Sequence, residues 1–161
     1  MPIRFDLQAM ARDEVKGILE RLQRGRCLMT NRQGTDLHEV IFKRSDRPGE
    51  GTLSALWHPY NCVLLDNTYH LKLGNNALHA LKHISYLMRM YGVKELDAYI
   101  RFVSMRTGAK TVDMWVNQRA NKIAKAVSVY TVGDDLWVED ANGRHWSFDR
   151  EWVGIENEFS N

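Results

Sequence analysis

Two short segments hold the side chains best suited to chemistry, LHEVI around His38 and NCVLLDNTYH from Asn61 to His70. In the first, His38 and Glu39 are neighbours, and neighbouring residues of a strand point to opposite faces, so the two can serve different tasks. In the second, an Asn and a His bracket an apolar run, although both side chains are costly to bury without partners. An imidazole can act as a base near neutral pH, and both imidazole and carboxylate can bind a divalent ion. These side chains could therefore supply a base and the ligands of a divalent ion.

The order of these residues resembles the HNH nuclease family, also called the His-Me finger family, whose fold is a ββα-metal finger. Members typically read CxxC, then HHI, then NLVLLCxxCH, and this chain has RCLMT, LHEVI and NCVLLDNTYH in that order, over about residues 26–74. The resemblance implies a metal-dependent endonuclease that hydrolyses DNA phosphodiester bonds. It also implies the catalytic residues: His38 and His70 bind the metal ion, Glu39 stands at the position of the base, and Asn61 hydrogen-bonds loop backbone to hold the finger in shape.

One departure from the family pattern concerns zinc. Many members hold a structural zinc ion with two CxxC pairs, and the corresponding positions here are Cys27, Thr30, Asp66 and Tyr69. One thiol out of four cannot hold a tetrahedral zinc site, so we expect no structural zinc. The helices outside the finger are expected to supply the stability instead.

The second departure is Glu39, which stands where the family commonly has the base His. By register, His38 falls on the metal-ligand position and Glu39 on the base position. By chemistry the opposite assignment, with Glu39 as metal ligand and His38 as base, is attractive, because magnesium prefers carboxylate ligands and an imidazole can act as a base near neutral pH. The strand fixes the register, so we favour His38 as the ligand. The expected cofactor is a divalent ion, with magnesium first and manganese, nickel or zinc as alternatives.

The bulk composition indicates one globular domain. The chain has 161 residues, of which 44% are hydrophobic and 26% charged, which argues against disorder. The first twenty residues are charged throughout, and no apolar run approaches the roughly 20 residues of a membrane span, so no membrane contact is expected. With only Cys27 and Cys62, a disulfide framework is implausible, and we expect a cytoplasmic protein. The resemblance implies a phage or mobile-element setting, in which case the location is the host cytoplasm.

Charge is distributed unevenly along the chain. Residues 1–126 contain 20 Lys and Arg against 12 Asp and Glu, whereas residues 127–161 contain 2 against 8. A basic body with an acidic tail predicts contact between the body and a polyanion, here DNA. The predicted phosphate contacts are Lys43, Arg44 and Arg47, which follow the first strand of the finger, together with His58 and Lys72. The acidic segment is expected to face away from the cleft, because its carboxylates would repel the substrate.

Two other classes of function stay open at this point. The chain can be a nucleic-acid-binding protein that keeps the finger without activity, which Glu39 and the missing cysteines favour. It can also be a protein-interaction module whose working surface is the acidic C-terminal segment. A homodimer is compatible with either class.

The elements that must position these residues follow from periodicity. Apolar residues at helical spacing predict helices over residues 6–22, 76–91, 94–105 and 111–127. Two strands within residues 37–65, separated by an extended loop, precede a short helix that begins near residues 67–70. From Ser128 the period changes to two, which predicts a meander of short strands. The predicted class is α+β, in one compact unit: residues 1–76 form the first helix and the finger, 77–127 a helical region, and 128–161 a small antiparallel meander.

A further pair of histidines lies on the predicted helix 76–91. His79 and His83 are four residues apart and therefore share one helical face, a spacing that could bind metal. The polar face of an amphipathic helix explains the pair as well.

Overall fold

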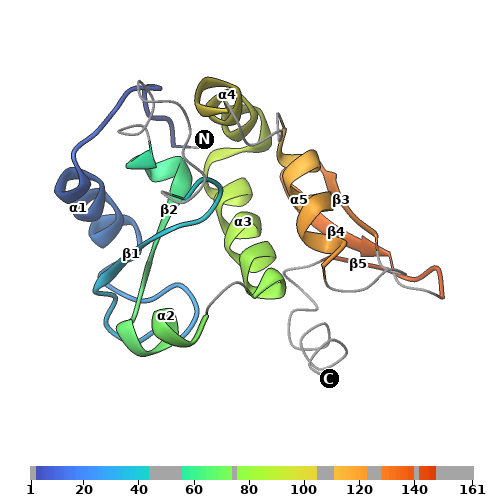
Figure 1. The fold of residues 1–161 in the computed structure, drawn as a ribbon, viewed down its shortest axis with the longest axis horizontal. Helices are drawn as coiled ribbons and strands as arrows, with labels where there is room; N and C mark the ends of the chain where they lie inside the picture. Colours follow the sequence, from blue (N-terminus) through green and yellow to red (C-terminus); the bar gives the residue numbers. More distant parts are fainter. Residues whose placement is uncertain are drawn as a thin grey trace.

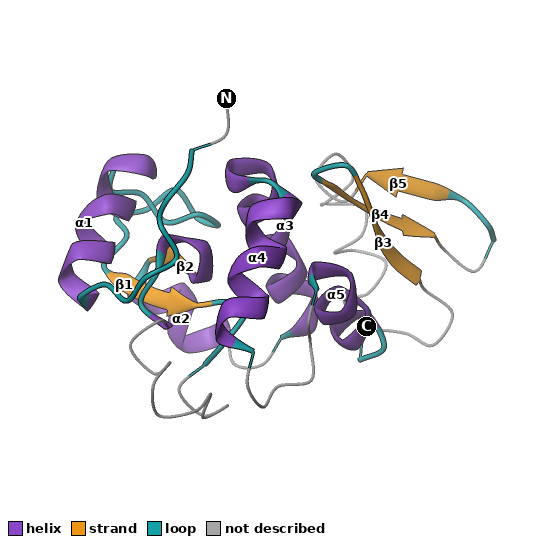
Figure 2. Cartoon of the chain, turned by 90° about the horizontal axis from the view of Figure 1, so that it is seen from above, coloured by secondary structure: helices purple, strands orange, loops and turns teal. Residues whose placement is uncertain are grey.

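The computed structural model describes residues 3–43, 56–73, 76–104, 111–122, 128–139 and 142–147, which form five α-helices and two small antiparallel sheets. This confirms the α+β class. In chain order the elements are α1 (Arg12–Leu22), β1 (Asp36–Glu39), the 3₁₀ turn η3 (Pro59–Asn61), β2 (Cys62–Leu65), α2 (Asn67–Leu73), α3 (Ala77–Tyr91), α4 (Val93–Val103), α5 (Val112–Ala120), β3 (Ser128–Val132), β4 (Asp135–Glu139) and β5 (His145–Ser147). α3 lies in the middle, with α1, the β1–β2 sheet and α2 on one side and α5 with the β3–β5 sheet on the other (Figure 1, Figure 2).

The β1–β2 sheet separates two packing layers. The strands pair antiparallel, with His38 opposite Val63 and Glu39 opposite Cys62. Directly opposed residues point to the same face, so His38 and Val63 share one face and Glu39 and Cys62 share the other. All of β2 is buried, because its two faces join different apolar clusters. The cluster on the α1 side consists of Val15, Leu19, Leu37, Cys62 and Leu64. α2 follows β2 along the chain.

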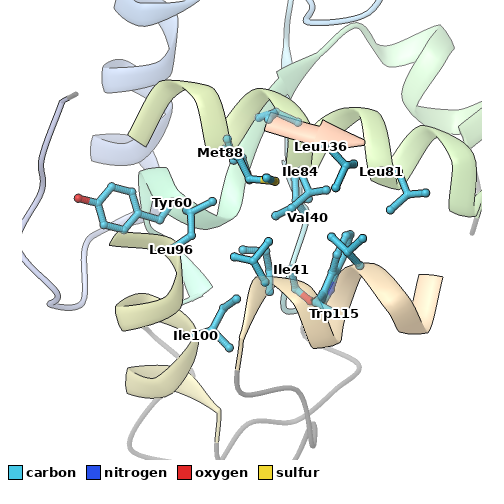
Figure 3. Packing of buried hydrophobic residues seen from close by; sticks show 14 of the residues in the cluster. Val40, Ile41, Tyr60, Leu81, Ile84, Met88, Leu96, Ile100, Trp115 and Leu136 are labelled. Atoms are coloured by element: carbon cyan, nitrogen blue, oxygen red, sulfur yellow. The ribbon is translucent and has the colours of Figure 1, made fainter. Parts of the chain in front are cut away.

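The main core is built around α3. Its apolar stripe is buried as predicted and comprises Leu78, Leu81, Ile84, Leu87, Met88 and Tyr91. Figure 3 shows Ile84 in one cluster with Val40 and Ile41 from the segment after β1 and with Trp115 from α5. The indole Nε1 of Trp115 also donates to the Ile41 carbonyl at 3.2 Å. This bond and the shared core fix α5 against the end of β1.

The first helix is shorter than periodicity predicted. We expected it to begin at Asp6, but α1 begins at Arg12. The backbone before it makes tertiary hydrogen bonds instead: the Phe5 amide donates to the Tyr60 hydroxyl at 2.8 Å, and the Asp6 carbonyl accepts from Nε2 of His58 at 2.8 Å. These bonds hold the chain across η3 and replace the first turns of the predicted helix.

The later helices agree with the prediction at their starts. The side chain of Asn76 caps α3 and that of Thr111 caps α5, each by accepting a backbone N–H of the first turn. α5 ends at Ala120, earlier than the predicted end at Val127, because the chain turns at Asn121 and Lys122; residues 123–127 lie outside the described residues. No helix in the described part of the chain is both long enough and apolar enough to cross a membrane.

The predicted meander is present over the described residues. β3 pairs with β4 and β4 with β5, all antiparallel, and the connecting turns contain Gly133 and Gly143 at positive φ. Leu136 and Val138 of β4 belong to the same core cluster as α3. Residues 148–161, which hold part of the acidic segment, lie outside the described residues.

Candidate metal centre

His38 and His70 lie next to each other, one on β1 and one on α2. Nδ1 of His38 is 3.2 Å from Nε2 of His70. Two nitrogens that bind one ion at about 2.0–2.1 Å in tetrahedral geometry stand about 3.3 Å apart. The sequence predicted that these histidines would be close, and their separation also matches that of two ligands of one ion.

The start of α2 fixes the position of His70. The Asp66 carboxylate accepts the N–H of Tyr69 at 2.7 Å, which is the bond that an N-capping side chain makes. The Asp66 carbonyl accepts the N–H of His70 at 2.9 Å. Because the cap sets where the first helical turn begins, His70 is brought against β1.

Asp36 orients the ring of His70, a role that our sequence analysis missed. Its Oδ2 is 2.9 Å from Nδ1 of His70 and also accepts a hydrogen bond from Asn67 at 3.0 Å. Nδ1 of His70 therefore carries the proton, and the lone pair of Nε2 faces His38. The hydrogen bond from His70 lowers the pKa of the Asp36 carboxyl. A carboxylate behind a histidine in this way is the usual partner of a metal ligand. Spacing could have revealed it, because Asp36 precedes His38 by two residues and so shares its face.

His38 is uncharged at neutral pH. Burial is the main cause that lowers its pKa to about 3, and the charge that His70 has when protonated and the charge of Lys43 act in the same direction. Only an unprotonated imidazole nitrogen can bind a metal ion. The contact with His70 is compatible with His38 as a ligand, and that assignment stays a prediction.

Glu39 lies on the other face of β1. The pairing places it with Cys62, away from the face that His38 shares with Val63. Its charge is felt at Cys62, whose pKa is raised to about 12 mainly by burial and to a smaller extent by Glu39. The role of Glu39 as general base therefore stays a prediction, and it does not share a face with the His38–His70 pair.

Asn61 makes the bonds to loop backbone that the sequence predicted. It is fully buried. Its Oδ1 accepts the N–H groups of Ile41 and Phe42 at 2.9 Å each, and its Nδ2 donates to the carbonyls of Phe42 at 2.9 Å and Leu56 at 3.0 Å. β1 ends at Glu39 rather than continuing to Phe42 because these amides bond to the Asn61 side chain instead of a neighbouring strand.

The four positions that correspond to zinc cysteines in the resembled family also lie together. The Thr30 hydroxyl donates to the Asp66 carboxylate, and the Met29 amide contacts Sγ of Cys27 at 3.4 Å. The bond from Thr30 and then the N–H of Tyr69 lower the pKa of Asp66. Hydrogen bonds thus connect the turn after α1 with the start of α2.

A third imidazole, His83 of α3, lies beside His38, with ring centroids 5.3 Å apart. Its Nε2 is 3.3 Å from the Tyr69 hydroxyl, which is 2.6 Å from Nδ1 of His79. His83 is 0% exposed, and its Nδ1 has no hydrogen-bond partner among the described residues. Of the two interpretations of the His79–His83 pair, the polar helix face does not hold for His83, which stands four residues before Leu87 and falls on the buried edge of the stripe.

A cavity of about 120 Å³ adjoins this cluster. His38 and His83 line it together with three cationic side chains, Lys43, Arg119 and Lys122. The cavity therefore lies between the end of β1, α3 and α5. Arg119 of α5 and Lys122, just after that helix, are cations that the sequence did not point to.

The other predicted phosphate contacts occupy different environments. Lys43 lines the cavity, and Lys72 is exposed on α2. His58 is 1% exposed, and both ring nitrogens are hydrogen-bonded inside the protein, Nδ1 to the N–H of Tyr60 and Nε2 to the Asp6 carbonyl. Its position is therefore wrong for a phosphate contact, and its role is to hold the N-terminal segment. Arg44 and Arg47 lie outside the described residues.

No protein-family model, curated protein sequence or solved structure matches this chain. The site is therefore interpreted from its own geometry. Within the described ranges, no three His, Cys, Asp or Glu side chains are arranged to hold an ion together. The described side chains of these four types therefore offer no third ligand to an ion at the His38–His70 pair.

Proposed function

We propose that this protein is a metal-dependent endonuclease of the HNH type, which hydrolyses DNA phosphodiester bonds at the His38–His70 pair. The observation that carries the proposal is the 3.2 Å separation of the two imidazole nitrogens, with Asp36 holding His70 in the tautomer that a ligand needs. The order of strand, strand and helix supports it, as does the cationic cavity beside His38.

The residues present fit a divalent ion. His38 and His70 would hold it, and a bound ion would polarise a phosphate oxygen and stabilise the charge that develops on it. Two imidazoles suit first-row transition ions such as manganese, nickel or zinc, whereas magnesium prefers oxygen ligands. We therefore place these ions ahead of magnesium, which reverses the order expected from sequence.

The chain's own groups divide the remaining tasks. Asp36 keeps the lone pair of His70 directed toward His38. Asn61 fixes the backbone of Ile41 and Phe42, and this backbone leads directly to Lys43 at the cavity. Lys43 supplies positive charge where a phosphate would lie.

The test is nicking of supercoiled plasmid with manganese, nickel, zinc or magnesium, each with and without EDTA. His70→Ala should abolish cleavage, whereas His145→Ala should keep it, because His145 is exposed on β5. Circular dichroism of both variants checks that they fold. Equal nicking by His70→Ala and the unmodified protein would remove this pair from the mechanism.

A second candidate is a nucleic-acid-binding protein that keeps this arrangement without catalysis. The observation that favours it is the position of Glu39, which does not share a face with His38. Salt-dependent DNA binding without cleavage under any of the four ions would support this candidate.

A further inference from the structure

We propose that the cavity between β1, α3 and α5 binds a phosphate group of a nucleic-acid backbone, beside the His38–His70 pair. The site uses two helices that lie outside the segment resembling the HNH family. It deepens the proposed function. That the phosphate belongs to a nucleic acid rests on the proposed function, whereas the ability of the cavity to bind a phosphate group does not.

The charge of the cavity selects an anion. Lys43, Arg119 and Lys122 line it, and no carboxylate is among its described lining residues. A second metal ion would be repelled by this set, whereas a phosphate would be attracted.

The N-terminus of α3 borders the cavity and also favours an anion there. Asn76, Ala77 and Ala80 line the cavity, and they are the N-cap and the first turn of the 15-residue helix α3. A helix N-terminus carries a partial positive charge and is a common position for phosphate.

His83 provides an independent indication of a ligand. It is 0% exposed and lines the cavity, and its Nδ1 has no hydrogen-bond partner among the described residues. A buried polar atom without a partner is costly, so the contents of the cavity are expected to supply one. The neighbouring network allows Nδ1 to donate: His79 Nδ1–H can donate to the Tyr69 oxygen, and the Tyr69 hydroxyl to Nε2 of His83, which leaves the His83 proton on Nδ1.

The cavity has the right size and stable walls. Its volume of about 120 Å³ is many times the roughly 10–15 Å³ that a cavity needs to hold one water molecule, so a phosphate group fits. Lys122 and Asn76 are exposed, so the site reaches the surface. The bond from Trp115 to the Ile41 carbonyl holds α5, and with it Arg119, beside the end of β1.

The experiment measures binding by the full chain in EDTA, so that neither a metal ion nor cleavage contributes. Inorganic phosphate is titrated in one arm and a short DNA duplex in the other. Arg119→Gln and Lys122→Gln should each weaken duplex binding about tenfold and flatten the slope of log K against log salt by about 0.9. The matched controls Arg101→Gln and Lys94→Gln, both exposed on α4, should leave duplex binding within about twofold.

A histidine ¹⁵N spectrum of the unmodified protein gives a readout that needs no variant. The Nδ1 resonance of His83 should move on addition of phosphate or duplex. Movement with duplex alone would assign the site to backbone phosphate, and movement with both would assign it to phosphate in general. A resonance that stays in place in both arms, or duplex binding by Arg119→Gln and Lys122→Gln equal to that of their controls, would overturn the proposal. Plasmid nicking is scored separately, so either idea can fail while the other holds.

Discussion

Asp36 is the residue on which the orientation of His70 depends, and its effect is measurable. Asp36→Asn should weaken manganese or zinc binding by about 10–100-fold. The uncharged amide oxygen accepts the Nδ1 proton of His70 more weakly than the carboxylate does, so it holds the tautomer less firmly. Isothermal titration of the ion measures this. Asp13→Asn, an exposed change on α1, is the control. Equal affinity for Asp36→Asn and the control would show that the carboxylate does not act through His70.

Asn61 holds the loop after β1 through its four backbone hydrogen bonds. Asn61→Ala leaves buried N–H and C=O groups without partners, so the free energy of unfolding should fall by roughly 1–3 kcal/mol. Urea denaturation measures the change. Asn117→Ala, at an exposed site on α5, should stay within about 0.5 kcal/mol. A loss at Asn61 no larger than at Asn117 would contradict the bracing role.

His58 makes stability depend on pH. Burial lowers its pKa below the ordinary value of 6.5, and its Nδ1 accepts the Tyr60 N–H. Below about pH 6.5 the unfolded chain therefore binds more protons than the folded protein, and stability is lost as pH falls. The melting temperature should drop between about pH 7.5 and 5.5. His58→Gln should flatten that drop, although other buried histidines keep part of it. An unchanged pH slope in His58→Gln would exclude this group.

At the scale of elements, the meander and α4 are joined by one carboxylate. Oδ1 of Asp134, in the β3–β4 turn, accepts the N–H of Val93 at the first turn of α4 at 2.8 Å. Asp134→Ala should cost about 0.5–2 kcal/mol, as loss of a capping side chain does, whereas Asp134→Asn keeps an acceptor and should cost less. Thermal unfolding of the two variants compares them. Equal losses would show that the bond to Val93 does not matter.

The spacing of apolar residues predicted those helices and strands whose apolar side chains are the ones buried in the core. α3 and the meander belong to this group, because apolar spacing alone sets which face is buried. The start of α1 and the end of β1 were not predictable in this way. In both places distant side chains, Tyr60 and His58 for the first and Asn61 for the second, take the backbone groups that a longer element would use.

The site was predictable where its residues are close in sequence and hidden where they are distant. His38, Asn61 and His70 came from one short motif. His83 and Arg119 reach the cavity only through the packing of α3 and α5 against β1, which no local pattern reports.

At the scale of the whole molecule, we expect DNA to bind the basic residues 1–126, and we expect the acidic residues 127–161 to lie away from the bound DNA. In the described part of the acidic segment, Asp135 pairs with Arg89 at 3.5 Å, and both side chains are more than half exposed. Asp135→Asn together with Glu139→Gln should leave DNA affinity within about twofold at physiological salt, where charges beyond roughly 8 Å are screened. Fluorescence anisotropy with a labelled duplex measures this. A many-fold gain would place the segment over the DNA-binding face.

The central claim is that His38 and His70 hold one divalent ion, and anomalous scattering from a crystal soaked in zinc or nickel tests it most directly. We predict a peak about 2.0–2.2 Å from both Nδ1 of His38 and Nε2 of His70, with Nδ1 of His70 still bonded to Asp36. Absence of a peak between these nitrogens in a crystal that binds the ion elsewhere, for instance at His79, would contradict the account.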